Sequence, residues 1–384
     1  MEKIIDDIFN VGVNDTKIDL FEGQYKVKDG MSYNSYLIID EKIAILDTVD
    51  KNFFDEWFSN LTTILKDRKP NYLIVSHMEF DHAANIIKLV EKYNDITIVG
   101  NVKTFTMIKQ FFNVEITNKL VVKENDTLSL GKHTLSFIFA PFVHWPEVMF
   151  TYDSYSKVLF SADAFGRFNT YENEASYLDE ARRYYIGIVG KYGNQVQSVL
   201  KKASNLNISI IAPLHGNVLK DNLAYYINKY DIWSKYEAEE EGILIAYCSV
   251  YGNTKDAVNL LVKTLNEKGY ENVFAYDLAR SDISKVISLA FKYNKLVLAS
   301  ITYNNSIFPF MNTFIEGLIE RNYQNRIVGF IENGSWAPIA NKVMKDKMHS
   351  LKNITFIENN VKILSAVNED TVKQIEKLAD SLID

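Results

Sequence analysis

The sequence has almost no cysteine, no long apolar run and no excess of positive charge. A single cysteine, Cys248, rules out an internal disulfide framework and any Cys-ligated zinc or iron–sulfur site. No apolar stretch approaches the roughly 18 residues of a membrane span, and the acidic N-terminus lacks a signal-peptide pattern. The formal net charge of -7 argues against a general nucleic-acid binder. We therefore expect a cytoplasmic protein with neither a membrane nor a nucleic acid as its partner.

The order of predicted elements indicates two domains of the α/β class. A chain of 384 residues exceeds one ordinary core, since domains average about 150 residues. Before an acidic stretch at 236–242, strands and helices predict two sheets packed together under outer helices. After it, five strands alternating with helices predict a parallel, doubly wound sheet. We therefore place the domains at 1–241 and 242–384.

These expectations rest on apolar periodicity along the chain. In the first half, the predicted strands cover 35–39, 43–47, 72–75, 96–99, 120–122, 134–140, 148–152, 158–161 and 208–212. The predicted helices there cover 53–65 and 102–112, with further helical patterns over 178–203. In the second half, the predicted strands cover 243–248, 273–276, 296–299, 327–331 and 354–357, and a helix over 369–382 closes the chain.

One short stretch concentrates side chains that can bind metals. Residues 76–82 read Ser-His-Met-Glu-Phe-Asp-His, between an apolar run typical of a buried strand and a helical apolar pattern. If this turn is extended, His77, Glu79 and Asp81 share one side while His82 points elsewhere, which suits two neighbouring metal ions better than one. A solvated polar turn is the alternative interpretation, because such residues are common in loops.

Further potential ligands lie just past other predicted strands. His144 lies in a short loop, whereas Asp163 and His215 each end an apolar run. Side chains at these positions can converge on one edge of a sheet, so the later residues favour a metal site over a chance cluster. The two remaining histidines, His133 and His349, lie in polar stretches and are expected at the surface.

The donor set restricts the metal without fixing it. Glu79, Asp81 and Asp163 carry three negative charges, so two divalent ions would leave one positive charge for a bridging hydroxide to cancel. Four imidazoles and three carboxylates are acceptable to iron, manganese or zinc, and they leave open positions for a small substrate. Glu79 in place of another imidazole favours oxidised iron, but zinc also tolerates a glutamate.

The second half carries a site of another kind. Ligands of a doubly wound sheet bind beyond the carboxyl ends of its strands, and the first such loop leads into a helix N-terminus suited to a phosphate. No Gly-x-Gly-x-x-Gly or Walker motif is present, and two further loops each carry an aromatic residue, which indicates FMN. An ordinary N-capped helix with aromatics packed at its rim is the alternative. The candidate flavin-binding residues are Ser249, Val250, Tyr251, Gly252, Asn253, Thr254, Ser300, Ile301, Thr302, Tyr303, Asn304, Asn333, Gly334, Ser335 and Trp336.

Together these motifs resemble those of the flavodiiron proteins, or A-type flavoproteins, over essentially the whole chain. The family motif His-x-Glu-x-Asp-His corresponds to residues 77–82, and its later single ligands correspond to His144, Asp163 and His215. Hydrolases of the same fold usually have His at the position of Glu79. The resemblance implies an N-terminal metallo-β-lactamase-like αββα sandwich followed by a C-terminal flavodoxin-like sheet. Because the chain ends after one flavodoxin domain, it looks like the minimal two-domain class.

The resemblance also implies roles for individual residues. One iron would be held by His77, Glu79 and His144, the other by Asp81, His82 and His215, with Asp163 bridging them. Tyr192 looks similar to a family tyrosine near the iron pocket, with a plain helix-surface tyrosine as an equal alternative. Tyr251 stands where many members have Trp, and Cys248 where many have Asp, which leaves the flavin potential open. We expect Cys248 to be an inert residue at a strand end.

The activity implied by the resemblance is reduction of O2 to water, of NO to N2O, or both. Two ferrous ions and one FMN hydroquinone hold the four electrons that O2 reduction takes, while coupling two NO takes two. The family further implies a head-to-tail homodimer, or a dimer of such dimers, with FMN of one subunit beside the irons of the other. The electron donor would be a small redox protein such as rubredoxin.

Two other functions fit parts of the pattern. A dinuclear zinc hydrolase of the metallo-β-lactamase fold would use the C-terminal domain as an accessory and would not depend on flavin. A flavodoxin-type electron carrier would contain a purely structural metal domain, which would not need seven ligands with open positions. Glu79 and the flavin loops favour the oxidoreductase.

Overall fold

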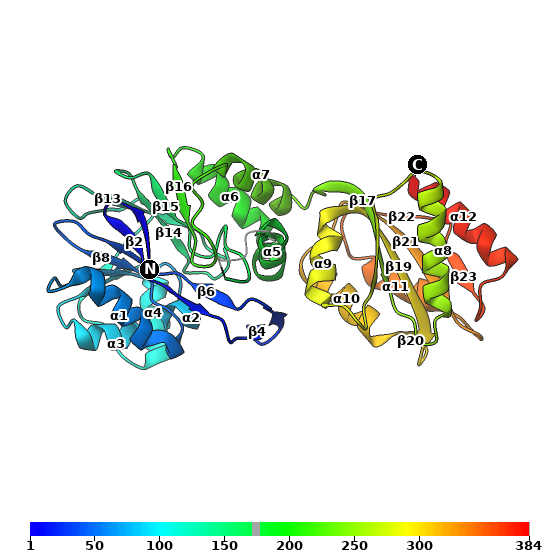
Figure 1. The fold of residues 1–384 in the computed structure, drawn as a ribbon, viewed down its shortest axis with the longest axis horizontal. Coiled ribbons are helices and arrows are strands. Elements are labelled where there is room, and N and C mark those ends of the chain that lie inside the picture. Colours follow the sequence, from blue (N-terminus) through cyan, green and yellow to red (C-terminus); the bar gives the residue numbers. More distant parts are fainter. Residues whose placement is uncertain (171–176, 384) are drawn as a thin grey trace. The chain divides into compact units, whose positions relative to one another are not determined.

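The computed structural model describes residues 1–170 and 177–383. It divides into two compact units, Met1–Asp231 and Ile232–Asp384 (Figure 1). The units divide earlier in the chain than the domain boundary predicted after residue 241, so the extent of the two domains stays a prediction. Within the described ranges, no helix combines the length and the apolar character that crossing a membrane requires.

Two sheets form the centre of the first unit. The first sheet is antiparallel from β1 to β8 and parallel from β8 to β11. Its strands, in sheet order, are β1 (Glu2–Ile5), β2 (Ile8–Asn10), β7 (Tyr36–Ile38), β8 (Ala44–Leu46), β9 (Tyr72–Ile74), β10 (Thr97–Gly100) and β11 (Lys119–Val121). The second sheet contains β12 (Thr127–Ser129), β13 (Thr134–Phe139), β14 (Met149–Asp153), β15 (Val158–Phe160) and β16 (Ile210–Ala212). Two small ribbons pair β3 (Val13–Asp15) with β6 (Met31–Tyr33), and β4 (Leu20–Phe21) with β5 (Tyr25–Lys26).

Successive side chains of a strand point to opposite faces, and in the first sheet both faces are buried. Leu73 and Ile98 pack with Trp57 in the core beneath the outer helices. Their neighbours Ile74 and Val99 pack in the core between the two sheets. This double burial explains why these strands have continuous apolar runs rather than alternating ones.

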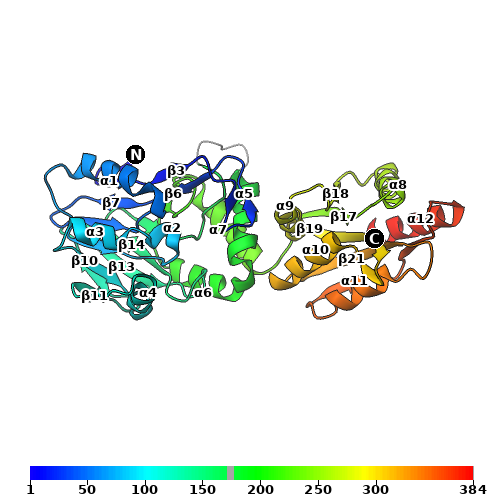
Figure 2. The same ribbon diagram turned by 90° about the horizontal axis from the view of Figure 1, so that it is seen from below.

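The helices of the first unit cover the outer faces of the sheets (Figures 1 and 2). They are α1 (Phe54–Leu65), α2 (Phe80–Ala83), α3 (Ile86–Lys92), α4 (Val102–Phe112), α5 (Tyr177–Tyr184), α6 (Gly193–Ala203) and α7 (Leu223–Ser234). On α1, Trp57, Leu61 and Leu65 are buried at a spacing of four residues, which presents one apolar stripe to the sheet. The layers confirm the predicted αββα sandwich.

The stretch over 178–203 is not one helix. After α5 the chain forms a π-helical turn at Tyr185–Val189 and a 3-10 turn at Gly190–Tyr192 before α6 begins. The ring of Tyr25 packs so closely on Gly187 that an added Cβ would lie 2.9 Å from it, so this contact requires glycine. Sequence patterning missed α7 altogether, because its apolar residues do not gather on one face.

The second unit is a parallel sheet with helices on both faces. Its strand order is β18-β17-β19-β21-β22, with β23 also parallel to β21, which confirms the predicted doubly wound arrangement. The strands are β17 (Glu240–Tyr247), β18 (Val273–Asp277), β19 (Tyr293–Tyr303), β20 (Ser306–Ile307), β21 (Arg326–Asn333), β22 (Ile354–Phe356) and β23 (Val361–Ile363). The helices are α8 (Asn253–Glu267), α9 (Ile283–Lys292), α10 (Pro309–Glu320), α11 (Ala340–Met348) and α12 (Glu369–Ile383). Helices α8 and α12 share one core with the sheet, and α9, α10 and α11 lie on the other side (Figure 1).

One histidine expected at the surface is buried. His133 is fully enclosed, and its Nδ1 lies 2.7 Å from the Asp153 carboxylate, whereas His349 is exposed as expected. The expectation for His133 was wrong because its neighbours in sequence are polar, while its partner comes from a strand twenty residues later.

Candidate metal centre and flavin pocket

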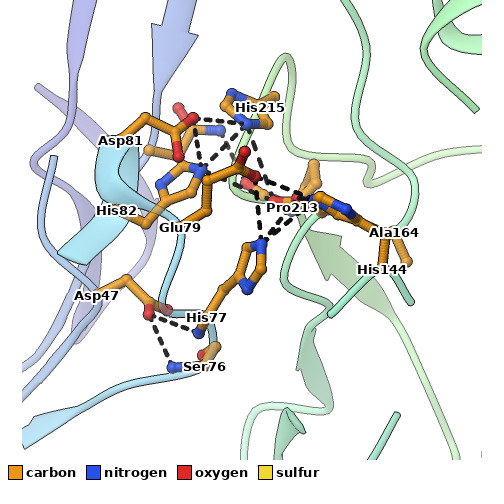
Figure 3. A network of polar contacts seen from close by, with 12 residues as sticks. Asp47, Ser76, His77, Glu79, Asp81, His82, His144, Ala164, Pro213 and His215 are labelled. Atoms are coloured by element: carbon orange, nitrogen blue, oxygen red, sulfur yellow. Dashed lines mark hydrogen bonds and ion pairs between the residues drawn. The ribbon is translucent and has the colours of Figure 1, made fainter. Parts of the chain in front are cut away.

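Four loops of the first unit bring the seven predicted metal ligands together. The turn from β9 into α2 carries His77, Glu79, Asp81 and His82, and the loop before β14 carries His144. Asp163 follows β15 and His215 follows β16. Figure 3 shows the labelled histidines and acidic residues of these loops pointing toward one another.

The ligands form two groups, and one residue faces both of them. His77, Glu79, His144 and Asp163 make up one group, while Asp81, His82 and His215 make up the other, with ligand atoms of each group within 4.8 Å of one another. Oδ2 of Asp163 lies 3.1 Å from Nε2 of His144 and 3.5 Å from Nε2 of His77. Its other oxygen, Oδ1, lies 3.7 Å from Nε2 of His82 and 3.8 Å from Nε2 of His215. The Asp163 carboxylate therefore stands between two possible cation positions.

The buried atoms of this cluster fit a pair of metal ions. Both carboxylate oxygens of Asp81 and of Asp163 are buried and accept no hydrogen bond from the described residues. Across the second group, the Nε2 atoms of His82 and His215 face each other at 3.0 Å. Buried carboxylates without hydrogen bonds are costly unless a cation compensates them. Imidazole nitrogens and carboxylate oxygens in these proportions suit iron, manganese or zinc.

The pKa shifts in the cluster favour ionised carboxylates. Burial opposes a charge on His77, but the negative charges of Asp163, Glu147 and Glu79 together raise the pKa of His77 well above its usual value. Burial also opposes a charge on His144, while the adjacent Asp163 carboxylate and a hydrogen bond to Glu79 raise its pKa to about 9. Burial alone would raise the pKa of Asp163, yet the charge of His77 holds it far below the usual range. Both imidazoles thus hold protons that a metal ion would displace.

The second group differs in its ionisation. Burial lowers the pKa of His82 to about 4, so this ring is neutral at ordinary pH. A neutral imidazole can bind a cation without first losing a proton.

Contacts behind the ligands fix their orientation. Nδ1 of His77 lies 2.8 Å from Oε1 of Glu147, which also accepts the Met78 backbone N–H at 2.8 Å. Nδ1 of His215 donates to the Ser32 carbonyl at 2.8 Å. These bonds leave Nε2 of both rings directed at the cluster, as metal-ligating histidines require. The Asp47 carboxylate accepts the backbone N–H groups of residues 76 and 77 at 2.7 and 3.2 Å and so holds the motif in place (Figure 3).

Sequence reasoning missed Glu147 and Asp47. Asp47 ends one predicted strand and Glu147 immediately precedes another, but nothing in the local sequence marks either as a partner of a residue about 30 or 70 positions away. The signal that could have indicated Glu147 is its position, because it is an acidic residue three positions after the predicted ligand His144.

Tyr192 contacts the loop that carries His144. Its ring stacks on Phe142 with the centroids 5.7 Å apart, and Phe142 precedes His144 by two residues. Tyr184 contacts a predicted ligand directly, since its buried ring is 5.4 Å from that of His215. A catalytic role for Tyr192 stays a prediction.

The predicted flavin loops line one pocket of about 530 Å³ in the second unit. All the predicted residues line it except Gly252 and Ser300, and Asn305, Ala337 and Ser365 line it in addition. Ser365 comes from a fourth loop that the sequence did not indicate. Its carbonyl accepts from Asn333 Nδ2 at 2.9 Å, and its N–H donates to Asn333 Oδ1 at 3.1 Å.

The pocket has the features that a phosphorylated flat ring requires. Gly252, with φ of 102°, immediately precedes α8 and turns the loop so that the helix N-terminus faces a phosphate position. Tyr251 and Trp336 are 93% and 82% exposed, so each can stack on a ring. The volume lies within the range of about 300–1,000 Å³ usual for cofactor sites. Burial raises the pKa of the nearby Cys248 thiol to about 12, which makes it an inert thiol.

The fold, the candidate metal cluster and the pocket of the second unit together indicate a class of protein that combines a dinuclear metal site with a flavin site. A family model described as ODP family beta lactamase matches residues 31–216. A protein named nitric oxide reductase from Moorella thermoacetica is 30% identical over 91% of this chain and 90% of its own length. The anaerobic nitric oxide reductase flavorubredoxin of Salmonella arizonae is 30% identical over 85% of this chain and 71% of its own. The chain belongs to the flavodiiron proteins.

Solved structures agree with this assignment. The flavodiiron protein from Giardia intestinalis superimposes with a TM-score of 0.92 and 26% identity, covering 100% of this chain and 96% of that one. The rubredoxin oxygen:oxidoreductase of Desulfovibrio gigas has the same fold, with a TM-score of 0.92 at 24% identity, covering 99% of this chain and 97% of that one.

Proposed function

We propose that this chain is an oxidoreductase that reduces O2 to water, NO to N2O, or both, at two iron ions supplied with electrons through FMN. The observation that carries the proposal is Asp163, whose two oxygens face two separate groups of ligands. The relatives named nitric oxide reductase and rubredoxin oxygen:oxidoreductase support this choice of substrates.

The first iron would be held by His77, Glu79 and His144, the second by Asp81, His82 and His215, with Asp163 between them. FMN would occupy the pocket of the second unit, its phosphate on the loop 249–254 and its ring near Tyr251 and Trp336. The metal domain would then cover residues 1–241, and the flavin domain residues 242–384.

The iron pair would bind and reduce the gas, and the flavin would replace its electrons. The residues of the chain orient and enclose this chemistry. Glu147 and the Ser32 carbonyl hold the rings of His77 and His215 with Nε2 toward the metals. Trp145 packs on His77, with centroids 5.2 Å apart, and keeps water from that side of the ligand. Glu79 and Asp81 are the partly exposed members of the cluster, and the other five predicted ligands are buried.

The partners and the location of the protein are also part of this proposal. The electron donor would be a small redox protein such as rubredoxin, as the names of the relatives suggest. The chain would form a head-to-tail homodimer, alone or as a dimer of dimers, in the cytoplasm.

The deciding experiment is analysis of metal and flavin in the purified protein, followed by single-turnover oxidation of the reduced protein with O2 and with NO. We expect about two irons and one FMN per chain with rapid reoxidation, and the faster gas identifies the substrate. Two zinc ions with no flavin would overturn the proposal in favour of the hydrolase, which the same ligands can also support.

A further inference from the structure

An apolar cavity of about 80 Å³ lies on the outer face of the second sheet of the first unit, under α6 and α7. Its floor comes from three neighbouring strands through Phe150, Leu159 and Ile211. Its roof includes Val196 and Val199 of α6.

The strand register explains why this space is apolar. Leu159 and Ile211 are directly paired on neighbouring strands, so their side chains share one face of the sheet. The adjacent residues Phe160 and Ala212 point the other way, into the core between the sheets. Side chains packed under α6 leave the space unfilled, although protein interiors are normally close-packed.

The cavity offers water no useful partner. Its lining contains two hydroxyl groups, and both are engaged. The Tyr230 hydroxyl accepts the backbone N–H of Phe165, and the Ser204 hydroxyl donates to the Lys201 carbonyl. A buried water normally makes about three hydrogen bonds, and apolar cavities without such partners stay dry and bind xenon or similar apolar molecules.

The lining of the cavity includes residues next to two predicted metal ligands. Val143 immediately precedes His144, and Ala164 immediately follows Asp163. Both of these lining residues are buried, whereas Ser204, which also lines the cavity, is exposed. A small apolar molecule in this space would therefore lie against two of the four loops that carry the predicted ligands.

We propose that this cavity binds a small apolar diatomic gas and delivers it to the metal centre from behind His144 and Asp163. This inference rests on the proposed function, which makes such a gas the substrate. A gas partitions from water into a dry apolar space for the same reason that other apolar solutes do. The cavity thus raises the local gas concentration without admitting water.

The first test uses xenon gas as a probe of the full-length protein as purified. We expect a single xenon site in crystals under pressure, bounded by Val143, Leu159 and Val199, together with a 129Xe NMR shift in solution. Val199→Phe should fill the space and abolish the site. Ser198→Phe is the matched control, because it places the same ring on the exposed side of α6. A cavity that takes up no xenon would overturn the proposal.

The second test measures gas kinetics in the same variants. Val199→Phe should lower kcat/KM for the gas by about threefold, which is somewhat under 1 kcal/mol in barrier, with kcat at saturating gas unchanged. Ala203→Leu near the outer end adds less bulk and should lower kcat/KM in the same direction, should Val199→Phe fail to fold. Xenon binding with unchanged kcat/KM in both filling variants would also overturn the proposal.

These measurements separate the two proposals. Xenon binding does not depend on which metal is bound or on flavin. A protein with zinc, no flavin and a xenon site would refute the proposed function. A diiron flavoprotein without a xenon site would refute only the proposal that the cavity binds the gas.

Discussion

The two candidate sites of this chain differ in the chemical groups that form them. The candidate metal centre consists of charged and imidazole side chains from four loops, and two of its carboxylates lack any hydrogen bond from the described residues. The pocket predicted to bind flavin lies at the carboxyl edge of one sheet and is lined by loop residues that include two exposed aromatic rings. Metal binding should therefore be lost when one charge in the cluster is removed, and flavin binding should weaken when the backbone of its loop is strained. A substitution in one site should leave binding at the other site unchanged.

The largest effect is expected from Asp163→Asn. Asparagine keeps the size of the side chain but cannot present a charged oxygen to both ligand groups. Metal content should fall from about two ions per chain to about one or fewer, and gas reduction should be lost. Metal analysis and flavin absorbance check this, with Asp55→Asn on the exposed side of α1 as the control. Loss of flavin together with the metal would contradict the independence of the two sites.

Glu147→Gln tests the orientation of His77 without removing a ligand. The amide keeps the shape but loses the charge that holds the Nδ1 proton of His77. Metal affinity should fall by about 10-fold to 100-fold, measured by competition with a chelator. The matched control is Glu124→Gln, whose partner Lys202 lies away from the ligands. Equal affinities in the two variants would show that Glu147 does not position the ligand.

Gly252→Ala tests the flavin pocket through its backbone. The added Cβ meets no atom within 4 Å, so the cost comes only from the positive φ of 102°. We expect FMN affinity to fall by about tenfold, from about 1–2 kcal/mol of backbone strain, with metal content unchanged. Gly269→Ala has the same kind of backbone at the other end of α8 and an equally open Cβ position. If that control weakened FMN equally, the effect would reflect stability rather than the phosphate loop.

The smallest effect on either site is expected from His133→Gln. Burial opposes the charge of His133, but its hydrogen bond to Asp153 and the negative charges of Asp153 and Asp40 together raise its pKa above the usual 6.5. Its stabilisation is therefore fully present below about pH 6.5 and declines as the pH rises through the higher folded pKa. The difference in free energy of unfolding from the unmodified protein, about 1–3 kcal/mol at pH 6, should shrink in that direction.

Urea unfolding at several pH values measures this difference, with the exposed His349→Gln as the control. Metal and flavin contents should match those of the unmodified protein. A difference that grew as the pH rose would show that His133 is neutral in the folded protein.

Local patterns were sufficient for most of the architecture. Strands such as β9 and helices such as α1 follow from apolar periodicity, which depends on neighbours within four residues. The same patterning failed for α7, whose apolar residues are spread around the helix, and for His133, whose partner is distant. The π-helical and 3-10 turns within residues 178–203 were also missed, and a distant residue, Tyr25 of the N-terminal ribbon, packs there against Gly187.

The sequence by itself determined the chemical types at the sites: four imidazoles, three carboxylates and a phosphate loop, each beyond a predicted strand. Only the tertiary structure decided which oxygen of Asp163 faces which group of predicted ligands, that Glu147 contacts His77, that Ser365 joins the pocket of the second unit, and that an apolar cavity is lined by neighbours of His144 and Asp163. The physical reason is the distance along the chain between the interacting residues. Helix and strand patterns depend on residues a few positions apart, whereas these contacts join distant segments that the packing of the sheets and loops brings together.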